Sequence, residues 1–139
     1  MDTLMNLRDV DDFLSETAVC FLATQGTDGP RVRAIMYQGT LLGRLWFWVD
    51  KDDAVYQQLK ACPTIELCAV KMDLTWLRVR GNAILEDNAA VKKWILEKDP
   101  TAGHVFGSID NPDFGIFCLE HGKIFQSDET GAPSSCALF

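Results

Sequence analysis

Apolar and polar residues follow patterns along the first part of the chain that predict one helix and then two strands. Over residues 3–16, leucine, valine and phenylalanine recur every three or four positions, which predicts an amphipathic helix with Thr3 as its N-cap. Residues 18–24 are continuously apolar and predict a buried strand. After a turn rich in Gly, Asp and Pro at 25–30, residues 31–37 alternate as a second strand, so the two predict a hairpin.

The rest of the chain continues as short strands with two further helices. After a Gly-containing loop at 38–43, we expect a strand over 44–49 and then a helix that is opened by residues 50–53 and ended by Pro63. Strands over 64–70 and 75–86 follow, and then a helix that is capped by Asp87 or Asn88 and ended by Pro100. The last two strands are expected over 114–119 and 123–127, on either side of a hairpin turn at His121-Gly122. Residues 101–112 show no clear pattern. The small, polar stretch 128–139 predicts a flexible tail.

Seven short strands joined mostly by short loops predict antiparallel pairing, because parallel neighbours need long crossover connections. The strands and helices do not alternate regularly, so a parallel sheet covered by helices is not indicated. We therefore predict a mainly β fold, a small antiparallel β-barrel with flanking helices, formed by residues 1–139 as a single domain.

Length, composition and charge narrow the class of protein. The chain has 139 residues, of which 47% are hydrophobic and 24% charged, as in an ordinary globular domain. No apolar run approaches the roughly 20 residues of a membrane helix, and the acidic N-terminus does not resemble a signal peptide. We predict a soluble cytoplasmic protein. Its net charge of −7 argues against nucleic acid and anionic membranes as partners.

Neither the cysteines nor the histidines predict a metal site. The five cysteines are irregularly spaced without a C-x-x-C pair, and His104 and His121 lie 17 residues apart. The final Cys136-Ala-Leu-Phe139 matches a prenylation pattern, which we interpret as coincidence because no polybasic segment precedes it. Phosphate-binding loops and hydrolase motifs are absent, so any chemistry is expected to depend on a bound cofactor.

Two pairs of arginines stand out against the acidic background. Arg31 and Arg33 share one face of the strand 31–37, where two guanidinium groups so close together favour an anion such as phosphate between them. The alternative is a solvated strand face paired with surface carboxylates. On the strand 75–86, Trp76, Arg78 and Arg80 share a face that suits a planar anionic ligand, or an arginine that merely covers the indole.

The strand 44–49 is aromatic on both faces. Trp46 and Trp48 lie on one face and Phe47 and Val49 on the other, so both faces are expected to be covered. One face would line the barrel interior. The other would form a subunit interface, where aromatic residues are enriched, or lie under a helix of the same chain.

The order of these segments resembles that of the pyridoxamine 5′-phosphate oxidase-like family of FMN-binding split barrels. The resemblance is closest to its short branch of nitroimidazole-resistance-type and general-stress-type proteins. It extends over roughly residues 10–125 and rests on Phe21-Leu-Ala-Thr24, Asp28-Gly-Pro-Arg-Val-Arg33, Leu45-Trp-Phe47, Val55-Tyr-Gln-Gln-Leu-Lys60, Pro63-Thr-Ile-Glu-Leu67, Trp76-Leu-Arg-Val-Arg-Gly-Asn-Ala83 and Glu86-Asp87.

The resemblance implies a split β-barrel homodimer that binds FMN at the subunit interface. It implies that Arg33, with Arg31, contacts the flavin phosphate. It also implies that Trp48 and Val49 run past the ring and offer backbone hydrogen bonds, and that Trp76 and Arg78 lie near the ring. We add Arg80 to this set because it shares a strand face with Trp76 and Arg78.

The sequence departs from the family pattern at the expected phosphate site. Where the family usually has Ser or Thr and a basic residue, this chain has Lys51-Asp52-Asp53-Ala54-Val55, in which only Lys51 is a cation. Gln38 also stands near a position that is usually basic. A riboflavin-like molecule, a deazaflavin or haem would each fit such a modified site.

Three functions are consistent with these observations. The first is an FMN-binding oxidoreductase that exchanges electrons between a reduced nicotinamide and a small acceptor, with no residue identified as catalytic. The second is a non-catalytic module that binds or senses a flavin or another planar anion. The third is a structural interaction protein whose arginines serve only a dimer interface.

Overall fold

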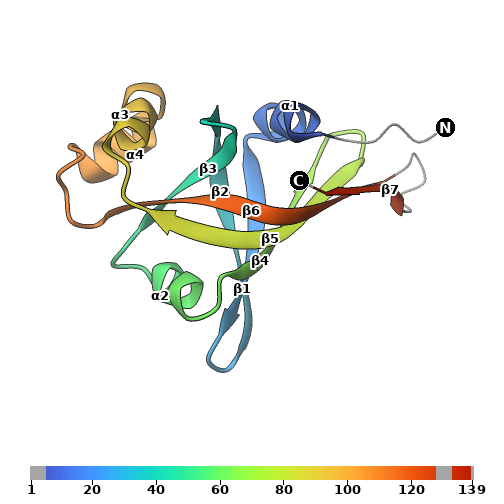
Figure 1. Cartoon of the computed structure of the whole chain (residues 1–139), viewed down its shortest axis with the longest axis horizontal. Helices are drawn as coiled ribbons and strands as arrows, with labels where there is room; N and C mark the ends of the chain where they lie inside the picture. Colours follow the sequence, from blue (N-terminus) through green and yellow to red (C-terminus); the bar gives the residue numbers. More distant parts are fainter. Residues whose placement is uncertain (1–5, 128–132, 139) are drawn as a thin grey trace.

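The structure is a computed structural model that describes residues 6–127 and 133–138, with four helices and seven strands in that part of the chain (Figure 1). In chain order, they are α1 (Leu7–Thr17), β1 (Val19–Gly26), β2 (Gly29–Leu41), β3 (Arg44–Asp50), α2 (Ala54–Ala61), β4 (Thr64–Val70), β5 (Trp76–Glu86), α3 (Ala89–Lys98), α4 (Pro100–Phe106), β6 (Phe114–Ser127) and β7 (Pro133–Leu138).

The strands form a closed antiparallel barrel, as the sequence predicts. They pair in the order β3-β2-β1-β4-β5-β6, and a further pairing of β3 with β6 joins the two ends. The closing ladder runs from Leu45 opposite Leu119 to Asp50 opposite Phe114. The last strand, β7, pairs with β6 outside the closed ring.

Every second residue of each barrel strand points its side chain into the barrel, and these side chains fill the interior. Phe47 stacks on Phe117 with ring centroids 5.1 Å apart, and Tyr37 lies 5.5 Å from Phe47 at a tilted angle. Helix α1 adds Val10 and Leu14 to the same core. These aromatic contacts pack β3 against β6 on one side and against β2 on the other, in addition to the backbone ladders that pair the strands.

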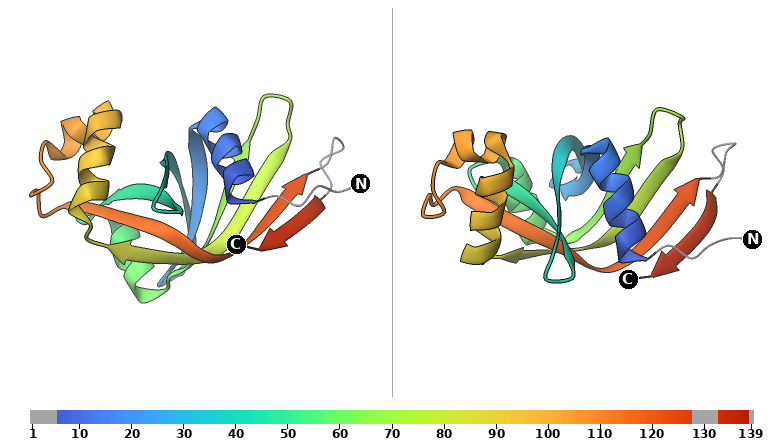
Figure 2. Two further views of the ribbon diagram at one scale, coloured as in Figure 1. Left: turned by 45° about the horizontal axis from the view of Figure 1, so that its top comes forward. Right: turned by 90° about the horizontal axis from the view of Figure 1, so that it is seen from above.

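A second, smaller core lies on the outer side of β3 and β6, under α3 and α4. Trp46 is fully buried there and donates its indole N–H to the carbonyl oxygen of Leu41 at 2.7 Å, while Phe106 stacks on Phe114 with centroids 4.5 Å apart. Figure 2 shows the two helices side by side at one end of the molecule. The outer aromatic face of β3 is therefore covered by helices of the same chain, which is the second of the two alternatives that the sequence leaves open for this face.

Two helix starts differ from the sequence prediction. Helix α1 begins at Leu7 because Asn6 is its N-cap, in a capping box with Asp9; Thr3, the predicted cap, lies outside the described residues. Helix α2 begins at Ala54, since Asp53 caps it rather than forming its first turn. Residues up to Asp50 instead extend β3, where the ladder with β6 satisfies their backbone.

The C-terminal part contains the larger differences. The predicted turn at His121-Gly122 is wrong, because β6 runs unbroken through it and pairs with the long β5 on both sides of a register shift. Residues 101–112 contain α4, which starts at Pro100 with Asp99 as its N-cap. Residues 133–138 of the predicted flexible tail form β7, and the rest of that tail lies outside the described residues.

Three further findings concern sites rather than architecture. No helix in the described part of the chain is both long and apolar enough to cross a membrane. Residues 6–127 and 133–138 hold no group of three or more His, Cys, Asp or Glu side chains arranged to bind a metal ion. Cys20, Cys62, Cys68 and Cys118 are free thiols, and burial raises the pKa of the Cys20 thiol to about 12.

Candidate functional site

A cavity of about 350 Å³ opens where β2 and β3 separate. The last residue pair between these strands is Tyr37 opposite Phe47; beyond it β2 continues along β1 and β3 continues along β6. A register shift between Tyr37 and Gly39 marks the point of separation. Gly39 has a φ of 127° there, and a Cβ on it would lie 3.2 Å from the Trp94 ring, so this bend favours glycine.

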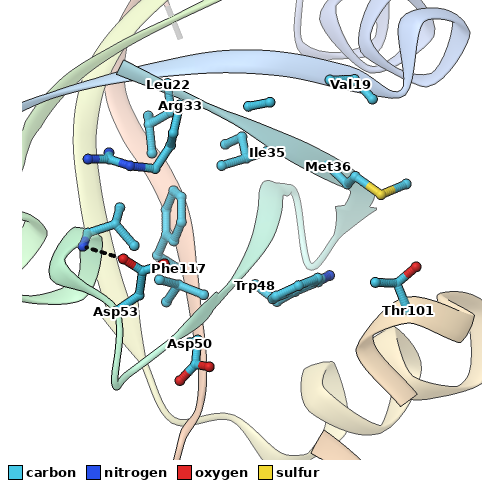
Figure 3. A pocket seen from close by; sticks show the side chains of 13 residues that line it. Val19, Leu22, Arg33, Ile35, Met36, Trp48, Asp50, Asp53, Thr101 and Phe117 are labelled. Carbon is cyan, nitrogen blue, oxygen red and sulfur yellow. Dashed lines mark hydrogen bonds between the residues drawn. The ribbon is translucent and has the colours of Figure 1, made fainter. Parts of the chain in front are cut away.

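The two strands that diverge supply the long walls of the cavity. From β2 come Arg33, Ala34, Ile35 and Met36, and from β3 come Trp48, Val49 and Asp50, with Leu22 and Phe117 behind them (Figure 3). Because these stretches of β2 and β3 do not pair with each other, the strand edges that face the gap can offer backbone groups to a ligand. The lining is mainly apolar, as in most small-molecule sites.

Trp48 forms one end of the cavity together with Met36 and Thr101 (Figure 3). Its indole N–H donates to the Asp99 carboxylate at 2.8 Å, and its ring meets Phe106 edge-on with centroids 5.4 Å apart. The position of the Trp48 ring is therefore set by the junction between α3 and α4.

Asp99 is the buried carboxylate that holds this end together. Besides Trp48 it accepts hydrogen bonds from Gln38 Nε2 at 2.9 Å and from the backbone N–H groups of Thr101 and Ala102 at 2.9 and 3.3 Å. Burial alone raises the pKa of the Asp99 carboxyl, but these hydrogen bonds together lower it below the usual 3.8. Asp99 is thus ionised at neutral pH and joins β2, β3 and α4.

Arg33 lies at the opposite end, where β1, β2 and α2 meet (Figure 3). Its guanidinium donates to Thr24 Oγ1 at 2.9 Å and to Gln58 Oε1 at 2.7 Å, and Thr24 donates to the same Gln58 oxygen at 2.6 Å. This triangle fixes the orientation of the guanidinium. Burial lowers the pKa of Arg33, and the Asp53 carboxylate acts in the opposite direction.

Two carboxylates share the lining with Arg33. Asp53 lies at the start of α2, where its Oδ1 accepts the backbone N–H of Val55 at 3.4 Å (Figure 3). Asp50 ends β3 and accepts the backbone N–H of Asp52 at 2.9 Å. The described lining therefore contains one cation, Arg33, and two anions, Asp50 and Asp53.

The other predicted site residues lie outside this cavity. Arg31 is at the β1–β2 turn, where it pairs with Asp28. Lys51 lines a separate hollow with Tyr56, its ammonium 5.9 Å from the ring centroid.

On β5, Trp76, Arg78 and Arg80 share one outward face, as predicted. Arg78 stacks over Trp76 at 4.4 Å, and Arg80 lies 5.4 Å from the Phe125 ring and 3.6 Å from Glu66. The described chain thus brings together Arg33, Trp48 and Val49 of the predicted set, but not the other five.

Sequence reasoning missed Asp99, Thr24 and Gln58 as parts of the site, whereas it placed Asp53 at the expected phosphate site. Asp99 precedes a proline that opens a helix, which is a signal for an N-cap but not for a contact with Trp48. Thr24 shares the inward face of β1 with Cys20 and Leu22, where a polar residue needs a partner, and Gln58 supplies it.

The family model described as pyridoxamine 5′-phosphate oxidase matches residues 8–128. A search of curated proteins finds no match.

Similar solved structures share the fold of this chain. A NimC/NimA family protein from Clostridium acetobutylicum is 22% identical with a TM-score of 0.88, covering 98% of this chain and 95% of that one. A pyridoxamine 5′-phosphate oxidase-related, FMN-binding protein from Nostoc punctiforme is 16% identical with a TM-score of 0.61, covering 100% and 99%. A heme-binding protein from Mycobacterium smegmatis is 20% identical with a TM-score of 0.68, covering 91% and 54%.

The cavity fits the ring of a flavin better than the phosphate of FMN. Its apolar walls, its strand edges and the Trp48 ring suit a planar heteroaromatic ring. A phosphate would meet Arg33 alone, because Arg31 and Lys51 lie elsewhere, and it would meet Asp53 beside that arginine. The residues present therefore fit a flavin ring and do not fit a phosphate group.

Replacing Asp99 by Asn should destabilise the fold and change its dependence on pH. Since the folded pKa of Asp99 lies below 3.8, its ionised form stabilises the chain above that pH, and this contribution is lost as the pH falls through the folded pKa. We expect Asp99→Asn to lower the free energy of unfolding at pH 7 by about 1–3 kcal/mol and to flatten its fall in acid. Urea unfolding followed by tryptophan fluorescence measures both. Asp110→Asn, at an exposed aspartate, is the control; equal slopes in all three proteins would contradict the assignment.

Proposed function

The chain belongs to the pyridoxamine 5′-phosphate oxidase family, and from this premise we propose that it is a flavin-binding oxidoreductase. It would hold a flavin by its ring in the cavity between β2 and β3 and exchange electrons between a reduced nicotinamide and a small acceptor. The observation that carries this proposal is the cavity itself, which has an indole at one end and a guanidinium at the other. A flavin-binding relative with the same fold supports it.

Different residues of the cavity would contact different parts of the ligand. Trp48, held by Asp99, provides a rigid apolar surface against which a planar ring can pack. The edges of β2 and β3 supply backbone donors and acceptors for the polar rim of the ring. Arg33 keeps N–H groups beyond those given to Thr24 and Gln58 and can donate them to the polar end of the ligand. The bound flavin would supply the redox chemistry.

A second candidate is a binding or sensing module without catalysis. It is favoured by the two carboxylates beside Arg33, which do not fit the phosphate of FMN. The relative from Mycobacterium smegmatis described as heme-binding supports a different planar ligand, and a deazaflavin is another candidate. In this case the cavity would bind the same class of planar ligand but no electron transfer would follow.

We also propose that the chain forms a homodimer. The outer surface of β1, β2 and β4 carries five exposed apolar side chains, here termed the outer apolar face: Val19, Phe21, Val32, Met36 and Val70. Val32 is 70% exposed and Phe21 49%, which is unusual for neighbouring side chains on a sheet without a partner.

The outer apolar face continues directly into the cavity, since Val19 and Met36 belong to both. A second copy docked on this face would close the open side of the cavity and place the ligand at the interface. Trp76 and Arg78 border the face opposite Val70 and Cys68, so their predicted contact with a ligand depends on this dimer. A cytoplasmic location and the lack of nucleic-acid and membrane partners stay predictions.

Flavin binding and redox competence can be read from the visible spectrum. With added flavin and subsequent removal of excess, we expect absorbance near ~450 nm that bleaches when reduced nicotinamide is added without oxygen. Bound flavin that fails to bleach, with dithionite as the positive control, would support the second candidate. A protein that stays colourless and whose melting temperature does not rise with flavin would overturn both.

Arg33→Ala should weaken flavin binding far more than folding. Loss of a charged donor to the polar end of the ligand is expected to raise Kd roughly tenfold or more, measured by quenching of flavin fluorescence. Arg31→Ala is the matched control, because Arg31 pairs with Asp28 outside the cavity, and we expect a change in Kd below about twofold. An equal rise in Kd in both variants would show that Arg31 also contributes to flavin binding. Loss of a cooperative thermal transition in Arg33→Ala would show that Arg33 is needed for folding instead.

Phe21→Glu should convert the protein to monomers. Phe21 lies opposite Ala34 of β2 and Cys68 of β4, in the middle of the outer apolar face, where a buried carboxylate would be strongly unfavourable. Size-exclusion chromatography with light scattering should give the mass of two chains for the natural sequence and of one for the variant. Leu42→Glu, at an exposed turn, should remain dimeric. A wild-type mass of one chain at micromolar concentration would refute the dimer.

A further inference from the structure

The polar end of the cavity is already organised around the protein's own groups. Arg33 gives one N–H from each Nη to the neutral oxygens of Thr24 and Gln58, and Gln58 is held in turn by Thr24. These partners fix the guanidinium without cancelling its charge. The carboxylate whose field acts on Arg33 is that of Asp53, which faces the same end of the cavity (Figure 3).

Asp53 also takes the place that a bound anion would use at the start of α2. A helix N-terminus attracts phosphate because its first N–H groups have no partner within the helix. Here the N–H of Val55, a residue that lines the cavity, is taken by Asp53 Oδ1 at 3.4 Å. The helix end that could have bound a phosphate therefore presents a carboxylate to the cavity.

The charges of this end disfavour a further anion but suit hydroxyl groups. Arg33, Asp50 and Asp53 together carry one negative charge, and a phosphate monoester would add ~1.5–2 more at neutral pH. A hydroxyl group can accept from the N–H groups that remain on Arg33 and donate to the Asp53 carboxylate. A flavin whose side chain ends in hydroxyls meets both needs.

We propose that the cavity selects a flavin without a terminal phosphate, of the riboflavin class, and that Asp53 is the residue that determines this specificity. This inference rests on the proposed function, since it requires that the cavity binds a flavin ring. Asp53 acts as a built-in counter-ion for Arg33, in the place where a phosphate would otherwise be needed.

The test compares two flavins on two proteins. We expect wild-type Kd for riboflavin to be at least about tenfold lower than for FMN, measured by quenching of flavin fluorescence at low ionic strength. Asp53→Asn keeps a side-chain acceptor for the N-cap and removes the charge. It should lower Kd for FMN by about tenfold while changing Kd for riboflavin by less than about threefold. Because Asp53 is exposed on the surface, the wild-type preference should shrink as salt is raised.

Two further variants make the result specific to position 53. Asp52→Asn removes the adjacent carboxylate, which does not line the cavity, and should leave the ratio of the two Kd values unchanged. Asp53→Ser provides a second neutral N-cap and should reproduce the effect of Asn if charge is the cause. Thermal unfolding of each variant shows whether the fold is intact.

Each remaining outcome is decisive. Equal wild-type affinities for FMN and riboflavin, or a ratio that stays the same in both Asp53 variants, would overturn this inference and leave the proposed flavin function intact. Failure of the wild-type protein to bind either flavin would overturn both proposals.

Discussion

The separation of β2 from β3 is the constraint on which the rest of the site depends. A barrel in which these strands stayed paired along their length would have no cavity. They part at Tyr37 and Phe47 because β3 is held to β6 by its own ladder, while β2 is held to β1. The stacked rings of Phe47 and Phe117 fix β3 in that position. The gap is thus the geometric result of two strands that are each paired with a different neighbour beyond this point.

The two ends of the gap are built by different means. At one end, Asp99 holds the Trp48 ring through a buried carboxylate with four hydrogen bonds, so shape is fixed by the junction of α3 and α4. At the other end, Arg33 is held by neutral partners and faces Asp53, so the net charge there depends on the side chain at position 53. A ligand therefore meets a rigid apolar surface at one end and a tunable polar surface at the other.

The sequence predicts local properties better than long-range ones. Period-two alternation correctly places Trp76, Arg78 and Arg80 on one face of β5, but alternation cannot say that this face points away from the cavity of the same chain. The N-cap pattern at Asp99 is local, whereas its contact with Trp48 joins residues 51 positions apart. Glycine is typical of turns, so the sequence predicts a turn at Gly122. In the fold β6 continues through that position, and Gly81 of β5 lies close to it: a Cβ on Gly81 would lie 3.0 Å from the Glu120 carbonyl oxygen.

The use of strand edges as cavity walls has a consequence for how such proteins diverge. Main-chain groups are present whatever the side chain, so much of a site made from two separated edges can survive extensive replacement of its residues. The fold of this chain and that of the Clostridium acetobutylicum protein agree with a TM-score of 0.88 at only 22% identity. Under this constraint, substitutions can change the few side chains at the ends of the gap, such as the one at position 53, without altering the barrel.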